Sequence, residues 1–442
     1  MPLSETLETR DIEHIWHPCS QMKDHETARL LTIVSAEGCY LKTDDGSLLF
    51  DAISSWWCKS LGHGHPRLKR ALKKQLEQFE HVIFAGTTYD AIVELSEKMT
   101  RLLPNVNKVF FASDGSSAVE IALKMSLHAH QIAGQHQRTH FVALENAYHG
   151  ETVGALSVSD LGLYKTPYKP LLFPTTFLQH IPYVRGSDDP LWHDCETEWV
   201  AIEKQLNNTP EQLSAIIVEP IVQGAGGIKI YSADFLRRLS AWAKTHGVHL
   251  IADEIMTGIA RTGKMLACEH AAITPDFLCL SKGLTSGFLP MSAVLTTQKI
   301  YDYFYDDYET GRSFLHSHTF SGNALAAAVA NETLSIVETE SIEHHATFIG
   351  QHMRKAMYAL ADEFTQLSNP RGIGAIAAID LPKDNRTPRL SLQIAVDAAK
   401  NGILLRPIDQ TLYWMPPLIA ETADLDRLYH ATRKVLSNLR IA

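Results

Sequence analysis

Along the middle of the chain, hydrophobic and polar positions follow two alternating patterns. Short, continuous apolar runs predict buried strands at residues 213–220, 248–254 and 277–280. Between the first two runs, residues 233–247 carry apolar side chains at helical spacing, and Gly247 suits the C-terminal cap of that helix. Helix, glycine and strand in this order predict a parallel α/β sheet.

A further helix is predicted where Pro66 suits a first turn. Residues 65–79 place five apolar side chains on one helical face: Leu68, Ala71, Leu72, Leu76 and Phe79. We expect that face to pack against the core.

The two ends of the chain follow a different pattern. Residues 38–52 predict a β-hairpin, in a segment too short to form its own core. Two long helices and two strand-like runs are predicted near the C-terminus, at 323–338, 347–364, 372–381 and 402–408. The expected division is an N-terminal segment at 1–55 that packs with the small domain, a large domain at 56–325 and a small C-terminal domain at 326–442.

Three charged residues stand where predicted strands end: Glu219, Asp253 and Lys282. Ligands of parallel α/β sheets bind at the carboxyl ends of the strands, so these residues predict a functional site at one sheet edge. Lys282 alone has an ordinary interpretation, a charged side chain with its head in water. That interpretation is favoured on position alone, but a lysine can also be a desolvated amine that condenses with a carbonyl.

Composition narrows the functional classes. The chain has 442 residues, of which 45% are hydrophobic and 20% charged, as expected for a globular protein with ample core. Its formal net charge of −10 gives no overall basic character for nucleic acid or an anionic membrane, and no apolar run approaches a membrane span. The polar N-terminus lacks a secretory apolar region, and six scattered cysteines form no C-x-x-C pair. We expect a cytoplasmic protein with reduced thiols.

Asp253 and Lys282 admit two interpretations, a plain ion pair or the two groups that a pyridoxal phosphate site requires. In the second, the lysine bonds the aldehyde of the cofactor and the carboxylate keeps the pyridine nitrogen protonated. A phosphate anchor would come from "FFASDGSSAVEIALKM", where a strand-like run turns through Gly115 and Ser116 into a helix. An ordinary serine N-cap is the alternative. Tyr148, beside a predicted turn, offers a ring for stacking on a planar cofactor.

The stretch "LIADEIMTGIARTGKMLACEHAAITPDFLCLSKGLTSG" resembles the core signature of the class III, pyridoxal-phosphate-dependent aminotransferases. The motifs "GHGHP", "GSSAVEIALK", "YHG", "VEPIVQGAGG" and "HTFSGN" occur in the family's order, so the resemblance spans nearly the whole chain. It implies a fold-type-I homodimer with active sites at the subunit interface. The implied fold class is α/β, with a mostly parallel sheet in the large domain and a smaller α+β domain from both termini.

Carried over position by position, the resemblance makes Lys282 the Schiff-base lysine, which also moves the proton, and Asp253 the partner of the pyridine nitrogen. Glu219 would support the residues that touch the cofactor. The other implied cofactor positions are Gly115 and Ser116 at the phosphate, Tyr148 and Ile255 on the two ring faces, and His318 and Thr319 from the other subunit. The implied substrate positions are Cys19, Trp56, Trp57, Tyr148, Lys282, Ser317 and Arg406.

A narrower set of motifs, including "IWHPCSQM", "SSWWCKSLGHGHP" and "LLRPIDQTLYWMPPL", is similar to one branch of this family. That branch transfers an amino group from S-adenosyl-L-methionine to 8-amino-7-oxononanoate in biotin biosynthesis. Arg406 would bind the carboxylate of the acceptor. The two tryptophans offer apolar, cation-tolerant faces, or else form part of a core. The chain departs from the family at Cys19, where a tyrosine is common, and at Ser317 and His318, where Gly and Pro are frequent.

Other functions remain as alternatives. Lysine could replace S-adenosylmethionine as the amino donor, or the chain could be another class III ω-amino-acid aminotransferase. A metal-dependent hydrolase is a distant alternative suggested by two H-x-H pairs, at 63–65 and 316–318, which zinc content would test. The glycines of "QGAGG" lack the full dinucleotide-binding pattern. An intact lysine and aspartate argue against a non-catalytic relative.

Overall fold

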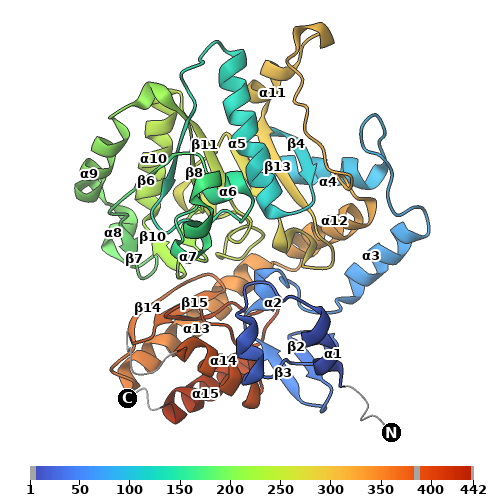
Figure 1. The fold of residues 1–442 in the computed structure, drawn as a ribbon, viewed down its shortest axis with the longest axis vertical. Coiled ribbons are helices and arrows are strands. Elements are labelled where there is room, and N and C mark those ends of the chain that lie inside the picture. Colours follow the sequence, from blue (N-terminus) through green and yellow to red (C-terminus); the bar gives the residue numbers. More distant parts are fainter. Residues whose placement is uncertain (1–5, 383–388, 440–442) are drawn as a thin grey trace.

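The computed structural model describes residues 6–382 and 389–439. Its elements form two groups (Figure 1): a large sheet flanked by helices, and a smaller region that holds both α1 (Leu7–His14) and α15 (Thr422–Asn438). Within the described ranges, no helix is both long and apolar enough to cross a membrane.

The large sheet has seven strands, and all but one run parallel. β13 is antiparallel to both of its neighbours, and the other pairs are parallel. In spatial order the strands are β4 (Val106–Ala112), β13 (Ser292–Thr297), β12 (Phe277–Leu280), β11 (His249–Asp253), β8 (Leu213–Val218), β5 (His140–Leu144) and β6 (Thr175–Leu178). β8, β11 and β12 are buried at every position, which explains their continuous apolar sequences. The three predicted strands and their parallel pairing are confirmed.

Helices cover both faces of this sheet (Figure 1). α5 (Gly115–Ile132) packs on β12, β13 and β8, and α10 (Ala233–His246) packs beside β11. Gly247 caps α10 at φ +63°, a left-handed conformation that glycine adopts without strain, so the predicted helix and cap are confirmed. The remaining helices of this region include α4 (Asp90–Thr100), α6 (Val153–Ser157), α7 (Gly162–Lys165), α8 (Pro190–His193), α9 (Glu196–Leu206) and α11 (Gln298–Phe304).

The predicted helix at 65–79 forms as α3 (Pro66–Leu76), but part of its expected apolar face is wrong. Leu68 is fully buried, whereas Leu76 is 52% exposed. Gln75 is buried instead. The helix ends before Phe79, and the side-chain amide of Gln75 donates to the carbonyl of Phe79 at 3.1 Å, which satisfies a buried polar group. Helix α3 packs against α12 (Ala324–Thr339).

The smaller region combines both ends of the chain in two sheets. One contains β1 (Ile33–Glu37), β2 (Tyr40–Thr43), β3 (Leu48–Asp51) and β16 (Ile403–Leu404); the other contains β14 (Ser368–Ile373), β15 (Ile376–Asp380) and β17 (Thr411–Trp414). The predicted hairpin at 38–52 is confirmed as β2–β3. The run at 372–381 is not one strand, because the chain turns at Gly374 between β14 and β15. Helices α13 (Ile342–Glu363), α14 (Leu390–Lys400) and α15 complete the region.

β16 pairs in parallel with β3, so the N-terminal segment and the C-terminal part share one sheet. This pairing supports the proposed small domain built from both termini. The proposed boundary between 325 and 326 falls inside α12, which packs on α3 and α4 as well as on α13. The division into domains therefore remains a prediction.

Candidate active site

The carboxyl ends of β4, β5, β8, β11 and β12 lie at one edge of the large sheet, because β13 is antiparallel to both β4 and β12 and the other pairs are parallel. Asp253 ends β11, Glu219 follows β8, and Lys282 comes two residues after β12. Asp253 and Glu219 both act electrostatically on the Lys282 amine. The structure thus brings the three predicted residues to the same edge.

Lys282 begins a short 3-10 helix, η5 (Lys282–Thr285), in an environment that disfavours its charge. Burial lowers the pKa of the amine, and the carboxylates of Asp253 and Glu219 oppose that shift only in part. Its Nζ atom lies 4.5 Å from the centre of the Trp57 ring. The backbone of Lys282 has φ +40°, a strained conformation for a residue with a side chain. Lys282 therefore combines a strained backbone with an amine that loses its proton more readily than a free lysine.

Asp253 is held by two hydrogen bonds in a buried position. Its Oδ2 atom lies 2.7 Å from Nδ1 of His149, and its Oδ1 atom accepts from the backbone N–H of Ile255 at 3.1 Å. His149 is itself fixed, because its backbone N–H donates to Oγ of Ser159 at 2.9 Å. The other ring nitrogen of His149, Nε2, is buried and has no hydrogen-bond partner within the described chain. The arrangement fixes the orientation of the Asp253 carboxylate.

Glu219 links two loops through hydrogen bonds to their backbones. Its carboxylate accepts from the backbone N–H of Tyr148 at 3.0 Å and of Gly224 at 2.8 Å. Burial raises the pKa of Glu219 to about 7, while His149 opposes the rise and Asp253 adds to it. The glycine-rich "QGAGG" stretch begins with the last residue of β9 (Val222–Gln223) and continues into the loop that leads to β10 (Lys229–Tyr231). Glu219 thereby positions Tyr148.

The start of α5 lies next to Ile255. A Cβ atom on Gly115 would lie 2.9 Å from Cδ1 of Ile255, so only glycine fits without a shift. The N-cap is Asp114, whose carboxylate accepts from the backbone N–H of Ser117 at 2.9 Å, and not a serine. Ser116 Oγ faces Gly150, where a Cβ atom would lie 2.1 Å away. The helix N-terminus therefore opens toward Ile255 and the loop that carries Tyr148.

Four residues, Cys19, Trp56, Tyr164 and Arg406, form a group that we term the Cys19 cluster. Nη2 of Arg406 donates to the carbonyl oxygen of Cys19 at 2.7 Å, and its guanidinium carbon lies 5.0 Å from the centre of the Trp56 ring. The Tyr164 hydroxyl lies 3.9 Å from Sγ of Cys19. The Tyr164 ring meets the Tyr148 ring edge-on, with centroids 6.2 Å apart. The cluster thus joins predicted substrate positions to a predicted cofactor position.

The two adjacent tryptophans occupy different environments. Trp57 is buried, and its Nε1 donates to the Tyr413 hydroxyl at 3.0 Å, whereas Trp56 is 45% exposed. They lie on α2 (Ser54–Trp57), where all four residues have positive φ, between 44° and 75°. This left-handed turn directs Trp57 to Lys282 and Trp56 to Arg406.

Residues 317–319 lie apart from this group. The His318 ring contacts the His316 ring, with 3.1 Å between their Nε2 atoms, and the carbonyl of Thr319 lies 2.7 Å from Nε2 of His81. Within the described chain, no hydrogen bond or ring contact joins Ser317, His318 or Thr319 to Lys282 or Asp253. The expected role of these three residues in cofactor or substrate binding remains a prediction.

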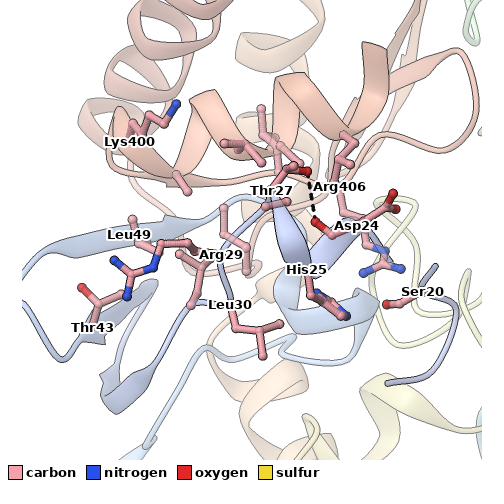
Figure 2. Close-up of a pocket in the computed structure, with 18 of the residues that line it drawn as sticks. Ser20, Asp24, His25, Thr27, Arg29, Leu30, Thr43, Leu49, Lys400 and Arg406 are labelled. Carbon is pink, nitrogen blue, oxygen red and sulfur yellow. Dashed lines mark hydrogen bonds between the residues drawn. The ribbon is translucent and has the colours of Figure 1, made fainter. Parts of the chain in front are cut away.

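A separate cavity of about 1180 Å³ lies between residues 19–32, the β2–β3 hairpin and α14 (Figure 2). Arg406 and Cys19 line one part of it, but Lys282, Asp253 and Tyr148 do not. Two residues that line this cavity, Arg389 at the start of α14 and Asp24 of the N-terminal segment, form an ion pair. This cavity is therefore not the candidate cofactor site.

The arrangement of a lysine, an aspartate and a helix N-terminus at one sheet edge agrees with the comparison to known families. The family described as "Aminotransferase class-III" matches residues 21–436. The chain belongs to the class-III aminotransferases. It is an aminotransferase, and the expected fold-type-I α/β class is confirmed by solved aminotransferase structures of the same fold.

Similar proteins cover 96% or more of this class-III aminotransferase. A Helicobacter pylori (strain ATCC 700392 / 26695) protein named adenosylmethionine-8-amino-7-oxononanoate aminotransferase is 40% identical, over 100% of both chains. The crystal structure of the Methanocaldococcus jannaschii protein of the same name has a TM-score of 0.90 at 31% identity and covers 98% of both chains. An amine transaminase from an uncultivated Pseudomonas species, in its PLP-bound form, has a TM-score of 0.89 at 30% identity, covering 96% of this chain and 98% of that one.

Sequence reasoning missed two residues of the site. His149 stands in the "YHG" motif, from which only Tyr148 was predicted as a site residue. The position of His149 directly after a strand-end turn was the available signal. Tyr164 lies on the four-residue helix α7, and no motif marks it. Neither of the two H-x-H pairs has a third metal-ligating side chain beside it, because the described residues contain no group of three or more His, Cys, Asp or Glu side chains placed to hold a metal.

Proposed function

We propose that this class-III aminotransferase uses pyridoxal 5'-phosphate to transfer an amino group from S-adenosyl-L-methionine to 8-amino-7-oxononanoate, giving 7,8-diaminononanoate in biotin biosynthesis. The observation that carries the proposal is the pairing of a Lys282 amine of lowered pKa with a buried, doubly hydrogen-bonded Asp253 at one sheet edge. The names of the full-length relatives support the choice of substrates.

The residues present fit the cofactor. The Asp253 carboxylate would pair with the pyridine nitrogen, and Tyr148 and Ile255 would cover the two faces of the ring. The N–H groups at the start of α5, with Gly115 and Ser116, would hold the phosphate, and the Gly115–Ile255 contact leaves no room there for a larger side chain. When bound, the cofactor supplies the electron sink that stabilises a carbanion.

The chain's own groups would then do the following work. The uncharged Lys282 Nζ takes the proton from the substrate α-carbon, and burial favours the neutral amine that this step needs. Asp253 holds a proton on the pyridine nitrogen, and His149 keeps that carboxylate in place. Arg406 binds the acceptor carboxylate, while Trp56 and Trp57 provide apolar surface for both substrates.

The proposed site also needs a second copy of the chain. Ser317, His318 and Thr319 would complete the substrate site and the phosphate site of the other subunit. Large apolar side chains near these positions are more than half exposed and would be covered in a homodimer: Ile83, Tyr305, Tyr308, Leu315 and Phe320. A cytoplasmic location also remains a prediction.

Addition of S-adenosyl-L-methionine alone to the cofactor-loaded enzyme tests the proposal. We expect the visible absorbance of the bound cofactor to fall, and 8-amino-7-oxononanoate to restore it. L-Lysine and 4-aminobutyrate serve as alternative donors, and Lys282→Ala, which should lose at least 1,000-fold in turnover, shows that the signal belongs to the site. A spectrum that responds to lysine but not to S-adenosylmethionine would overturn the proposed donor.

A further inference from the structure

Tyr164 brings to the Cys19 cluster a hydroxyl group that the proposed reaction has not used. Its side chain is 43% exposed, on α7. The hydroxyl contacts Sγ of Cys19 at 3.9 Å, and Arg406 Nη2 donates to the carbonyl oxygen of the same residue at 2.7 Å. A phenol and a guanidinium therefore meet at one residue, and both carry hydrogen-bond donors.

The present partner of the Tyr164 hydroxyl is weak. A thiol sulfur is a poor acceptor, so the hydroxyl loses little when it turns to a stronger one. Burial raises the pKa of Tyr164 to about 12, and Arg406 opposes the rise, so the phenol keeps its proton at neutral pH. A carboxylate is the acceptor that gains most from two such donors, because hydrogen bonds to charged groups are the stronger ones.

The surroundings fix both donors. The Trp56 ring supports one face of the Arg406 guanidinium at 5.0 Å. The Tyr164 ring rests edge-on against Tyr148, whose hydroxyl donates to Oε1 of Glu151 at 2.9 Å. These contacts restrict both donors before a ligand binds, which reduces the conformational freedom lost on binding.

We propose that Tyr164 and Arg406 together bind the carboxylate of the acceptor, which makes Tyr164 a specificity-determining residue. This inference rests on the proposed function. Lys282 contacts Trp57 and Arg406 contacts the adjacent Trp56, so the two tryptophans separate the reacting amine from the carboxylate site. That separation suits an acceptor whose carboxylate lies at the far end of an alkyl chain from its reacting carbonyl, as in 8-amino-7-oxononanoate.

The test compares Tyr164→Phe, which removes only the hydroxyl, with Tyr168→Phe, an exposed tyrosine on the neighbouring 3-10 helix η2 (Thr166–Leu171). We expect Tyr164→Phe to raise the KM for 8-amino-7-oxononanoate about tenfold or more. The kcat, the visible spectrum and the half-reaction with S-adenosylmethionine should change less than twofold. Tyr168→Phe should match the wild type in every measurement.

A double-variant cycle decides whether the two donors share one carboxylate. In an Arg406→Lys background, the effect of Tyr164→Phe on the acceptor KM should shrink to less than threefold, because the carboxylate is already displaced. An undiminished effect there, or an acceptor KM within twofold of wild type for Tyr164→Phe, would overturn the inference.

Failure of the proposed function is separable from failure of this inference. If the wild type does not turn over 8-amino-7-oxononanoate, the proposed substrate is wrong. Nonanoate, a carboxylate of the same chain length, then serves as a competitive inhibitor of whichever amine the enzyme accepts. Tyr164→Phe should weaken its inhibition about tenfold; unchanged inhibition would overturn the role of Tyr164 whatever the substrate.

Discussion

The Nδ1 atom of His149 lies 2.7 Å from the Oδ2 atom of Asp253, and both side chains are buried. Replacing the ring by His149→Phe would leave a buried carboxylate with one donor fewer. We expect the dissociation constant for pyridoxal phosphate to rise about tenfold or more, because residues that orient a ligand-binding group typically contribute that much. A titration of apoenzyme followed by visible absorbance measures it.

His149→Asn is the matched comparison, since its amide keeps a donor near the position of Nδ1. It should recover part of the lost affinity. The exposed His180→Asn should bind the cofactor as the wild type does. Equal affinities for the phenylalanine and asparagine variants would show that the ring fills space and does not orient Asp253.

Gly115→Ala should weaken cofactor binding without unfolding the protein. The added Cβ atom would lie 2.9 Å from Cδ1 of Ile255, so either that side chain or the start of α5 must move. We expect at least a tenfold loss of pyridoxal phosphate affinity, since a displaced helix N-terminus loses its alignment with the phosphate. Gly162→Ala is the control, because nothing lies within 4 Å of its added Cβ atom. Identical affinities for the two variants would contradict a phosphate site at Gly115.

Glu254 predicts a pH dependence of stability. Its buried carboxylate accepts from the backbone N–H groups of Ala267 and Cys268 at 2.7 and 2.8 Å, and burial raises its pKa from 4.5 to about 7. Between these values the folded state holds a proton that the unfolded state has released. The contribution of Glu254 is therefore greatest below pH 4.5 and is lost as the pH rises to about 7.

Glu254→Gln removes this titration. Between pH 5 and pH 8, the free energy of unfolding of the wild type should fall relative to that of the variant, by at most about 3 kcal/mol. Thermal unfolding of both proteins at equal cofactor saturation measures the difference. A constant difference across this range would show that the Glu254 pKa is not raised.

Arg261 should stabilise the left-handed turn that carries the tryptophans. It is almost fully buried, and its guanidinium donates to the carbonyls of Pro416 and Ala375 and to Oγ of Ser54, with no carboxylate partner among the described residues. Burial lowers its pKa to about 9. Arg261→Met would leave these acceptors without donors and should lower the free energy of unfolding by about 2–5 kcal/mol.

The exposed Arg237→Met, which loses only an i,i+3 ion pair, should cost less than about 1 kcal/mol. A similar loss in both variants would mean that Arg261 contributes no more than a surface charge. Denaturant-induced unfolding of the wild type and both variants measures the two losses.

The predicted parts of the site are those that depend on local sequence. Glu219, Asp253 and Lys282 could be placed because continuous apolar runs mark buried strands, and parallel strands bring their ends to one edge. Gly115 was found for a similar reason, as the glycine between a strand and a helix. Each of these predictions needed only a few neighbouring residues.

The parts that were missed depend on contacts between distant segments. The turn at residues 54–57 has positive φ at all four positions and contains no glycine, so the local sequence does not predict it. It is held by contacts such as Ser54 Oγ to the carbonyl of Met415 at 2.7 Å. Tyr164 likewise meets Cys19 across a long stretch of chain.

The two-residue strand β16 has a consequence for how the enzyme is made (Figure 1). β3, just before the tryptophans, is synthesised early, but its partner β16, just before Arg406, follows only after residues 52–402. At the usual pace of a ribosome this takes about 20 to 70 s. During that interval one edge of β3 is open to pairing with other chains. The nascent chain therefore exposes this edge of its N-terminal sheet until the segment just before Arg406 has been translated.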